Sequence, residues 1–504
     1  MSTLIHGGHI LSNDGSGTVR ADLLLRAGMI EAVNAPGTHV AEEIELIDAQ
    51  DCLVIPGLTN GHTHAHGALG RGAVPDRISL EGFLAYAPAL IGRRSTEDLR
   101  LSATLCAVEL ARKGCTSCID MAAELPMVTL EGMVAIGQAY ADVGIRAVVA
   151  PMISDRTLYE AYPQLTTTLP AHVKAQALGM KAPSTSALLD VCRQAQREWP
   201  FDRHKVQLGV GPAIPLHCSD ELLIGCAEIS REFDVPLQTH LLESKLQAIA
   251  QSRSAESTVQ RLHRLGCLTG RTSLAHGVWI DADDMALIAS SGATLVHNPM
   301  SNLRLGSGVA PLRQLLSAGV RVAIGTDASN TSDGQNMFES IRLAAYLSRI
   351  GSPDWASWVS AEEVFESATS GASRALGLEG LLGRLQPGQL ADLVIIDLAQ
   401  SHYVPLRHPL RQLVFGESGA GIRRVLVGGR TIFADGRVQT ADERALRMAA
   451  QEAAARLDRA GAPAAEFAAA AYPALAAFCC DGQMAALGVH RQLFRNDDAV
   501  KDKP

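Results

Sequence analysis

The chain has 504 residues, 47% of them hydrophobic, which suits either one large α/β barrel with an accessory domain or several domains and excludes a small disulfide-stabilised fold. The formal net charge is −9, and Lys and Arg are scattered along the chain, so we expect no nucleic-acid partner. The N-terminal residues do not form a basic segment followed by an apolar one. We therefore expect a cytoplasmic protein with reduced cysteines.

Both ends of the chain carry short strand patterns. Residues 22–26, 29–33 and 45–48 are apolar runs separated by Gly, Pro and Asn, and similar runs return at residues 391–397 and 424–432. Although sequential elements usually neighbour each other, the simplest arrangement joins the two blocks. We expect a small β-sandwich domain built from residues 1–55 and 385–440.

The middle of the chain, residues 56–384, alternates apolar strand-like runs with helix-length segments. Ser95 and Asp98 have the spacing of a capping box, and Gly114 marks the end of the same helix. Apolar strands that alternate with helices predict a parallel sheet covered by helices, and eight such units predict a (β/α)8 barrel of the TIM type. An open doubly wound sheet is the alternative. The eight strands are expected at residues 53–60, 116–120, 146–152, 206–212, 236–240, 272–276, 293–297 and 320–327.

Residues 441–504 are rich in alanine and predict a helical C-terminal extension. We expect it to pack on the barrel or on a partner subunit, since a homo-oligomer is anticipated. The most apolar part, residues 464–480, is interrupted by Glu466 and Pro473. It therefore predicts packed helices and no membrane span.

Titratable side chains gather at the predicted strand ends, where a barrel enzyme has its active site. The alternation of strand residues places His62 and His64 on the same side of the first strand. Strands five to eight each end in an imidazole or a carboxylate: His240, His276, His297 and Asp327. One such residue alone is more often a hydrogen-bonded core residue, but together imidazoles and a carboxylate suit a zinc-type ion.

Five motifs in this order resemble those of the amidohydrolase superfamily. They are PGLTNGHTH at residues 56–64, THLLE at 239–243, LAHG at 274–277, HNPMSNL at 297–303 and IGTD at 324–327. The chain is most similar to the aminohydrolase branch, which includes S-adenosylhomocysteine and methylthioadenosine deaminases, guanine and cytosine deaminases and s-triazine hydrolases. The resemblance covers roughly residues 1–440 and includes the flanking β domain.

The resemblance implies one divalent metal, zinc with iron as the alternative. Its ligands would be His62, His64, His240 and Asp327. Binuclear relatives supply a bridging Lys from strand four, and residues 206–212 contain none, which favours a single metal.

Further roles follow from the same resemblance. Glu243 would be the proton shuttle, although the alternative is a surface carboxylate on the first turn of the next helix. His276 would polarise the attacking water or the substrate, and Asp327 would act in catalysis as well as in metal binding. The motif of His297, Ser301 and Asn302 would shape the substrate pocket.

Two more residues are candidate substrate contacts. His66 extends the alternating pattern of the first strand to the same face, and its alternative is a supporting or loop role. Arg71 lies in the Gly-rich loop Gly70–Gly72, where it either binds an anionic or carbonyl group or bridges loops.

The expected activity is that of a hydrolase of carbon–nitrogen bonds other than peptide bonds. Hydroxide formed on the metal would attack a ring carbon of a purine, pterin, pyrimidine or triazine and release ammonia. One alternative removes a halide or alkylamine from a triazine or opens a cyclic amide, and another is a non-catalytic binding relative. Nucleoside deaminases of this branch commonly have Pro-His-Ala-Pro-Tyr after strand four. Ala213 occupies the slot of that His, which weakens the nucleoside hypothesis.

Overall fold

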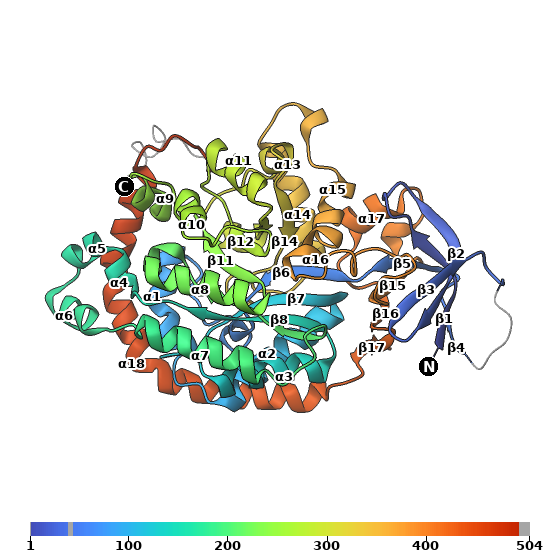
Figure 1. Ribbon diagram of the computed structural model, residues 1–504, viewed down its shortest axis with the longest axis horizontal. Coiled ribbons are helices and arrows are strands. Elements are labelled where there is room, and N and C mark those ends of the chain that lie inside the picture. Colours follow the sequence, from blue (N-terminus) through green and yellow to red (C-terminus); the bar gives the residue numbers. More distant parts are fainter. Residues whose placement is uncertain (1, 39–43, 493–504) are drawn as a thin grey trace.

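The computed structural model describes residues 2–38 and 44–492. A ring of strands and helices forms the body of the molecule, a β-sheet lies at one end, and a long helix runs along one edge (Figure 1). The parts of the predicted β domain and of the helical extension at residues 1, 39–43 and 493–504 lie outside the described residues.

The barrel contains the predicted strands in chain order. They are β6 (Leu58–Thr63), β7 (Cys115–Ala122), β8 (Arg146–Ile153), β9 (Val206–Leu208), β10 (Gly211–Pro212), β11 (Leu237–Leu241), β12 (Thr272–His276), β13 (Thr294–His297) and β14 (Arg321–Ile324). The fourth predicted strand is thus divided into β9 and β10, both of which pair with β8.

The strands close into a ring through two junctions. One group runs β10-β8-β7-β6 and the other runs β11-β12-β13-β14, with parallel pairing within each group. Gln238 N donates to Val210 O at 2.9 Å at the first junction, and Asp327 N donates to His62 O at 3.0 Å at the second. The predicted (β/α)8 barrel is confirmed, and its strand ends meet at one mouth.

The first predicted strand, residues 53–60, is wrong as a single element. Residues Cys52–Pro56 form β5, which belongs to the outer sheet, and the barrel strand begins only at Leu58. Gly57 lies at the crossing between the two sheets. A Cβ there would lie 2.1 Å from Thr116 Oγ1, so only glycine allows the chain to pass.

The outer sheet joins the two ends of the chain. Its strands are β1 (Ser2–Leu11), β2 (Thr18–Arg26), β3 (Met29–Asn34), β4 (Glu45–Asp48), β5, β15 (Leu393–Asp397), β16 (Ile422–Val427), β17 (Arg430–Ala434) and β18 (Arg437–Val438). β5 pairs with β1 on one side and antiparallel with β15 on the other. Both halves contribute to one apolar core that includes Leu23, Ile30, Val54, Leu393 and Leu426. The exact limits of the domains stay predictions.

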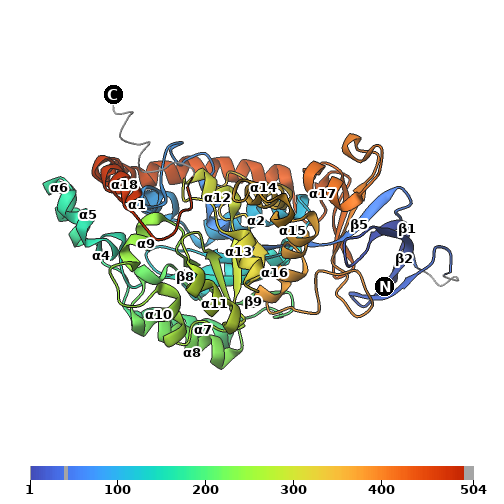
Figure 2. The ribbon, with the colours of Figure 1, turned by 90° about the horizontal axis from the view of Figure 1, so that it is seen from above.

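Helices surround the strands of the barrel, and the three short helices between residues 158 and 179 project beyond one end of it (Figures 1 and 2). The helices are α1 (Leu80–Ile91), α2 (Thr96–Arg112), α3 (Leu130–Val143), α4 (Leu158–Ala161), α5 (Pro163–Thr168), α6 (Ala171–Gly179), α7 (Thr185–Glu198), α8 (Asp220–Phe233), α9 (Lys245–Gln251), α10 (Thr258–Arg264), α11 (Ala282–Ser291), α12 (Pro299–Arg304), α13 (Leu312–Ser317), α14 (Met337–Ile350), α15 (Ala361–Ser367), α16 (Ser370–Ala375) and α17 (Pro409–Gly416). The predicted capping box is present at α2, where Ser95 and Asp98 exchange hydrogen bonds.

The C-terminal extension is one long helix, α18 (Glu443–Met484), that packs across α1, α2, α5 and α9. It approaches α1 closely, because a Cβ at Gly461 would lie 2.5 Å from Ala89 O. Among the described helices, α18 is long and apolar enough to cross a membrane, and 28% of its most apolar window is buried in the fold. The expected absence of a membrane span stays a prediction.

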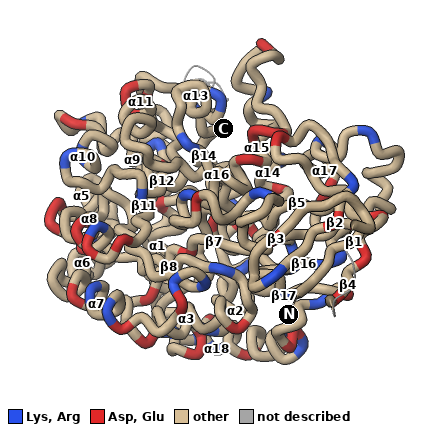
Figure 3. The backbone as a smooth tube through the Cα atoms, turned by 45° about the vertical axis from the view of Figure 1, so that its right-hand side comes forward, with Lys and Arg blue, Asp and Glu red and all other residues tan. Residues whose placement is uncertain are grey.

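Charged residues of both signs are interspersed over the described backbone (Figure 3). One pair of them, Arg146 on β8 and Asp392 beside β15, is buried between the barrel and the outer sheet. Arg146 Nε lies 2.9 Å from Asp392 Oδ2, and Nη2 lies 3.1 Å from Oδ1. Asp392 Oδ1 also accepts from Gly428 N at 2.7 Å. The two side chains are 7% and 2% exposed, so water cannot take the place of either partner if that partner is removed.

We predict that Asp392→Ala lowers the free energy of unfolding by about 3–5 kcal/mol, because it leaves a buried guanidinium unpaired. Chemical denaturation measures the shift. Asp142→Ala is the control, since it breaks the exposed Arg100–Asp142 pair and should cost at most about 1 kcal/mol. Equal effects of the two substitutions would contradict the prediction.

Candidate metal centre

The four predicted metal ligands converge at the mouth of the barrel. His62 and His64 come from the end of β6, His240 from β11, and Asp327 from the segment after β14. His64 Nε2 lies 3.1 Å from His240 Nε2 and 3.4 Å from Asp327 Oδ1, and His62 Nε2 lies 3.6 Å from the same oxygen. All four side chains are buried.

Two residues at this mouth, one of the four ligands and a neighbouring histidine, have unusual backbone conformations. Asp327 has φ +62° and His276 has φ +76°, values that few residues other than glycine adopt. Such conformations persist where the surrounding structure enforces them, and they often mark functional sites. Gly325 lets the chain pass there, because a Cβ at this position would lie 2.3 Å from Asn298 Oδ1 and 3.0 Å from His62 Cβ.

Each histidine of the ligand set has its Nδ1 occupied by a fixed acceptor. His64 Nδ1 donates to Met121 O at 2.7 Å, and His240 Nδ1 donates to Ala213 O at 2.6 Å. His62 Nδ1 donates to Gln238 Oε1 at 2.8 Å, because the Gln238 amide nitrogen is itself used as a donor to Gly61 O and Ser273 Oγ. In a neutral ring the other nitrogen is then a lone pair, so three Nε2 lone pairs face the centre.

These residues fit a divalent metal ion. Burial lowers the pKa of His62 to about 3 and that of His240 well below its usual range, so both rings are neutral. If the His64 ring is neutral, its bond to Met121 O directs the lone pair of its Nε2 at that of His240, 3.1 Å away, and His62 Nε2 has no hydrogen-bond partner among the described residues. A cation between them relieves this repulsion, and three imidazoles with one carboxylate are ligands that zinc-type ions prefer.

The carboxylate of Asp327 is ionised. Burial alone would raise its pKa, but the positive charge that the imidazoles of His64, His62 and His276 carry when protonated holds that pKa below its usual range, and a cation held by the neutral rings would act in the same direction.

The pKa of the Glu243 carboxyl group is shifted in the opposite direction to that of Asp327. Its side chain is 2% exposed, so the alternative of a surface carboxylate is wrong. Burial, followed by the charges of Asp327 and Glu81, raises the pKa of Glu243 well above its usual range. Its Oε2 lies 3.5 Å from His276 Nε2, and its Oε1 lacks a hydrogen-bond partner in the described part of the chain. Two carboxyl groups with separated pKa values are thus present in one cluster.

His276 lies between these two carboxyl groups. Its Nδ1 donates to Asn302 Oδ1 at 2.9 Å, so its Nε2 lone pair points toward Glu243 and, at 3.9 Å, toward Asp327 Oδ2. Burial lowers the pKa of His276 as well. Asn302, predicted as a substrate contact, is therefore first of all the residue that orients His276.

The other predicted substrate contacts divide into two groups. His297 is buried near His276, and its ring nitrogens have no hydrogen-bond partner within residues 2–38 and 44–492. Ser301 is also buried, and its hydroxyl helps to hold the pKa of Asp327 low. The ring of His66 lies 5.0 Å from that of His64, and its Nδ1 accepts from Ala123 N at 3.4 Å. Arg71 is half exposed and pairs with Glu109, so the contact joins its loop to α2. Their roles toward substrate stay predictions.

Comparisons with known proteins agree with this site. Residues 53–432 match the model of the Amidohydrolase family. The chain belongs to the amidohydrolase family. This amidohydrolase is 32% identical over 454 positions to 5-methylthioadenosine/S-adenosylhomocysteine deaminase of Nitratidesulfovibrio vulgaris. The alignment covers 88% of this chain and 92% of the relative. The chain is 30% identical over 474 positions to 5'-deoxyadenosine deaminase of Methanothermobacter thermautotrophicus, covering 90% and 99%.

Solved structures resemble this amidohydrolase over nearly the whole barrel. An adenosine deaminase from Xanthomonas campestris with bound zinc has a TM-score of 0.79 and 25% identity, covering 90% of this chain and 98% of that one. Atrazine chlorohydrolase from Arthrobacter aurescens, also with zinc, has a TM-score of 0.79 at 24% identity, with 90% and 100% covered, and shows the fold alone. The predictions of an amidohydrolase fold, a hydrolase and a divalent metal are confirmed.

Sequence reasoning missed several residues that hold the ligands of the amidohydrolase in place. Gln238 orients His62, and its position two residues before His240 on the same strand face is a signal that could have found it. Asn60 joins the first and last strands, because its Oδ1 accepts from Thr326 N at 3.1 Å. Gln335 donates to Asp327 O at 2.7 Å, and its place in an irregular loop gave no signal.

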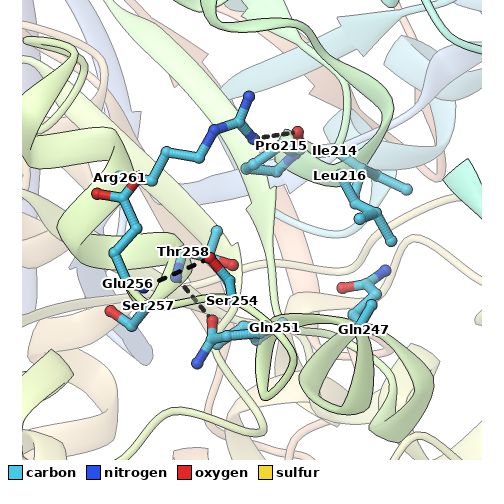
Figure 4. Close-up of a pocket in the computed structure, with 12 residues that line it drawn as sticks. Ile214, Pro215, Leu216, Gln247, Gln251, Ser254, Glu256, Ser257, Thr258 and Arg261 are labelled. Carbon is cyan, nitrogen blue, oxygen red and sulfur yellow. Dashed lines mark hydrogen bonds between the residues drawn. The ribbon is translucent and has the colours of Figure 1, made fainter.

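A cavity of about 210 Å³ lies beside the loop that carries Glu243 (Figure 4). Gln247 lines it and accepts from Glu243 N at 2.8 Å, while Gln247 Nε2 has no partner among the residues that the structure describes. Arg261 reaches across it to Pro215 O at 2.7 Å and also pairs with Asp220. This guanidinium is thus held by one carboxylate and by backbone carbonyls of the loop before α8.

We predict that the purified amidohydrolase contains about one divalent metal per chain and that His240→Ala reduces it nearly to none, because a ligand is lost from a buried set. Elemental analysis measures the content. His297→Ala is the matched control, since His297 is also a buried strand-end histidine but is outside the proposed ligand set. Two tightly bound metals per chain, or full metal content in His240→Ala, would show the ligand assignment to be wrong.

Proposed function

We propose that this amidohydrolase is a deaminase that uses one zinc ion, held by His62, His64, His240 and Asp327, to hydrolyse an amino group from an N-heterocycle. The observation that carries the proposal is the buried Glu243, whose carboxyl group has a raised pKa and lies 3.5 Å from His276 Nε2. A buried carboxyl group with a raised pKa holds its proton more tightly than an exposed one and can donate it to a ring nitrogen.

When bound, the metal supplies Lewis acidity and lowers the pKa of water at the site. Asp327 is ionised and His276 Nε2 is a lone pair, so both accept hydrogen bonds from the attacking water and orient its oxygen toward the ring carbon. Glu243 donates its proton to the neighbouring ring nitrogen, which makes that carbon electrophilic. As the C–O bond forms, Glu243 takes one proton from the water and passes it to the amino group. The C–N bond then breaks and ammonia leaves, and the remaining hydroxyl proton passes to Glu243 as the carbonyl forms, which restores the carboxylic acid.

The substrate class proposed first is the 6-aminopurines. The two curated relatives described above are both named as deaminases of adenosine-type compounds. Ala213 follows β10, where nucleoside deaminases commonly have a histidine, and its carbonyl orients His240 at 2.6 Å. We therefore propose an aminopurine whose substituent differs from that of a simple nucleoside. We also propose that the enzyme is a cytoplasmic homo-oligomer.

Ammonia release from a panel of aminated purines, purine nucleosides, pterins, pyrimidines and triazines tests the proposal. A chlorotriazine belongs in the panel, because release of chloride without ammonia would favour the alternative leaving group. Turnover should require the metal and disappear after chelation. Absence of turnover on every amino-heterocycle by protein with a full metal content would overturn the proposal.

We predict that Glu243→Gln lowers kcat by about 10²–10⁴-fold, because Gln keeps the shape but cannot relay a proton. Metal content should be unchanged, since Glu243 is not in the proposed ligand set. Steady-state kinetics on the best substrate of the panel, together with elemental analysis, measure both. Glu256→Gln is the control, because Glu256 is a partly exposed carboxylate in the next loop that pairs with Arg264. Near-normal kcat in metallated Glu243→Gln would remove Glu243 from the mechanism.

A further inference from the structure

The last described residues of the C-terminal extension contact two loops of the active site. After α18 the chain continues past α9 toward the start of α11 (Figure 1). Arg491 Nε donates to Val278 O at 2.9 Å, and Arg491 Nη2 donates to Ile280 O at 2.9 Å. Val278 lies two residues after His276, so the guanidinium holds the backbone of the His276 loop at two points.

The backbone of Arg491 holds a second loop. Val309 N donates to Arg491 O at 2.8 Å, in the segment that follows α12, the helix of Ser301 and Asn302. The approach is close, because a Cβ at Gly308 would lie 2.8 Å from Arg491 O and Gly308 has φ +121°. One residue of the extension thus connects the loops after β12 and β13.

These two loops also contact each other beneath Arg491. Trp279 Nε1 donates to Ser307 O at 2.8 Å, and Ser307 N donates to Asn302 O at 2.8 Å. His276 and Gly277 both have positive φ, so this loop starts from a conformation that its surroundings must enforce. Arg491 holds Val278 O and Ile280 O, directly after these two residues, and so helps to keep the loop in this conformation.

We propose that Arg491 is a positioning residue, which holds the His276 loop against the Asn302 helix so that His276 Nε2 stays aimed at Glu243 and Asp327. Its consequence for turnover rests on the proposed function. A planar guanidinium with its donors in fixed directions suits two carbonyls of one loop, which the single ammonium of Lys does not match. The alternative is that Arg491 only anchors the end of the chain.

The two roles differ in their effect on kinetics. An anchor contributes stability, whereas a positioning residue changes kcat with little change in KM or in metal content, because the proposed metal ligands lie on other elements. Misplacement of a catalytic group by about 1 Å costs up to about 100-fold in rate.

For Arg491→Ala we therefore expect kcat to fall by about 10- to 100-fold with KM and metal content close to wild type. Arg491→Lys should recover only part of the loss. Arg456→Ala is the matched control, since Arg456 joins α18 to Asp98 on α2 and contacts neither active-site loop. An unchanged kcat in Arg491→Ala would overturn the proposal.

A double-mutant cycle with Asn302→Ala separates positioning from anchoring. If Arg491 acts through the His276–Asn302 pair, the two substitutions together should cost clearly less than the sum of their separate effects on ΔΔG‡ for kcat/KM. Additive effects would show that Arg491 does not act through this pair and would overturn the proposal.

Amide hydrogen exchange tests the same contact without any substrate. Arg491→Ala should speed exchange in residues 276–282 and 305–309, and Arg456→Ala should leave these segments unchanged. Unchanged exchange there in Arg491→Ala would overturn the proposal even if no substrate is found. If the wild-type protein turns over nothing in the panel while exchange changes as expected, the proposed function fails and the positioning contact stands.

Discussion

The site depends on the repulsion between imidazole lone pairs that the fold forces together. His64 and His240 face each other at 3.1 Å, and the carbonyls of Met121 and Ala213 fix both rings in the tautomer that places no proton between them. Such an arrangement of neutral rings costs free energy by itself, and a cation bound between the rings would offset that cost. The barrel offsets this cost. The carbonyls that orient the rings belong to strands or strand ends that are hydrogen-bonded to the neighbouring strands.

The same frame gives two carboxyl groups different chemistry a few ångströms apart. Asp327 is surrounded by imidazoles, and its pKa is lowered, whereas burial and the neighbouring acids Asp327 and Glu81 raise the pKa of Glu243. Their environments, not their side-chain type, decide which accepts and which donates. His276 lies between them with its Nε2 unprotonated, so hydrogen bonds can extend from one carboxyl group through the reacting water to the other.

The sequence predicted the elements whose signals are local. Alternation of His62 and His64 with strand period, the capping box of Ser95 and the polar ends of apolar runs all depend on neighbours along the chain. Division of the first strand at Gly57 was missed, because its cause is Thr116 in another strand. The role of Asn302 toward His276 and the contacts of Arg491 were missed for the same reason: their partners are set by tertiary packing. Burial of Glu243, which decides its chemistry, likewise follows from segments far away in the sequence.

The pairing of β5 with β15 has a consequence for how the chain is made. On the ribosome, β1 and β5 emerge early, but the edge of β5 that β15 covers stays open until almost the entire barrel has been synthesised. An open edge next to the apolar run of residues 52–56 is a site for pairing with other chains. Nascent chains should therefore be most prone to aggregation while the barrel is being translated, and the outer sheet should be the last layer to reach its native pairing.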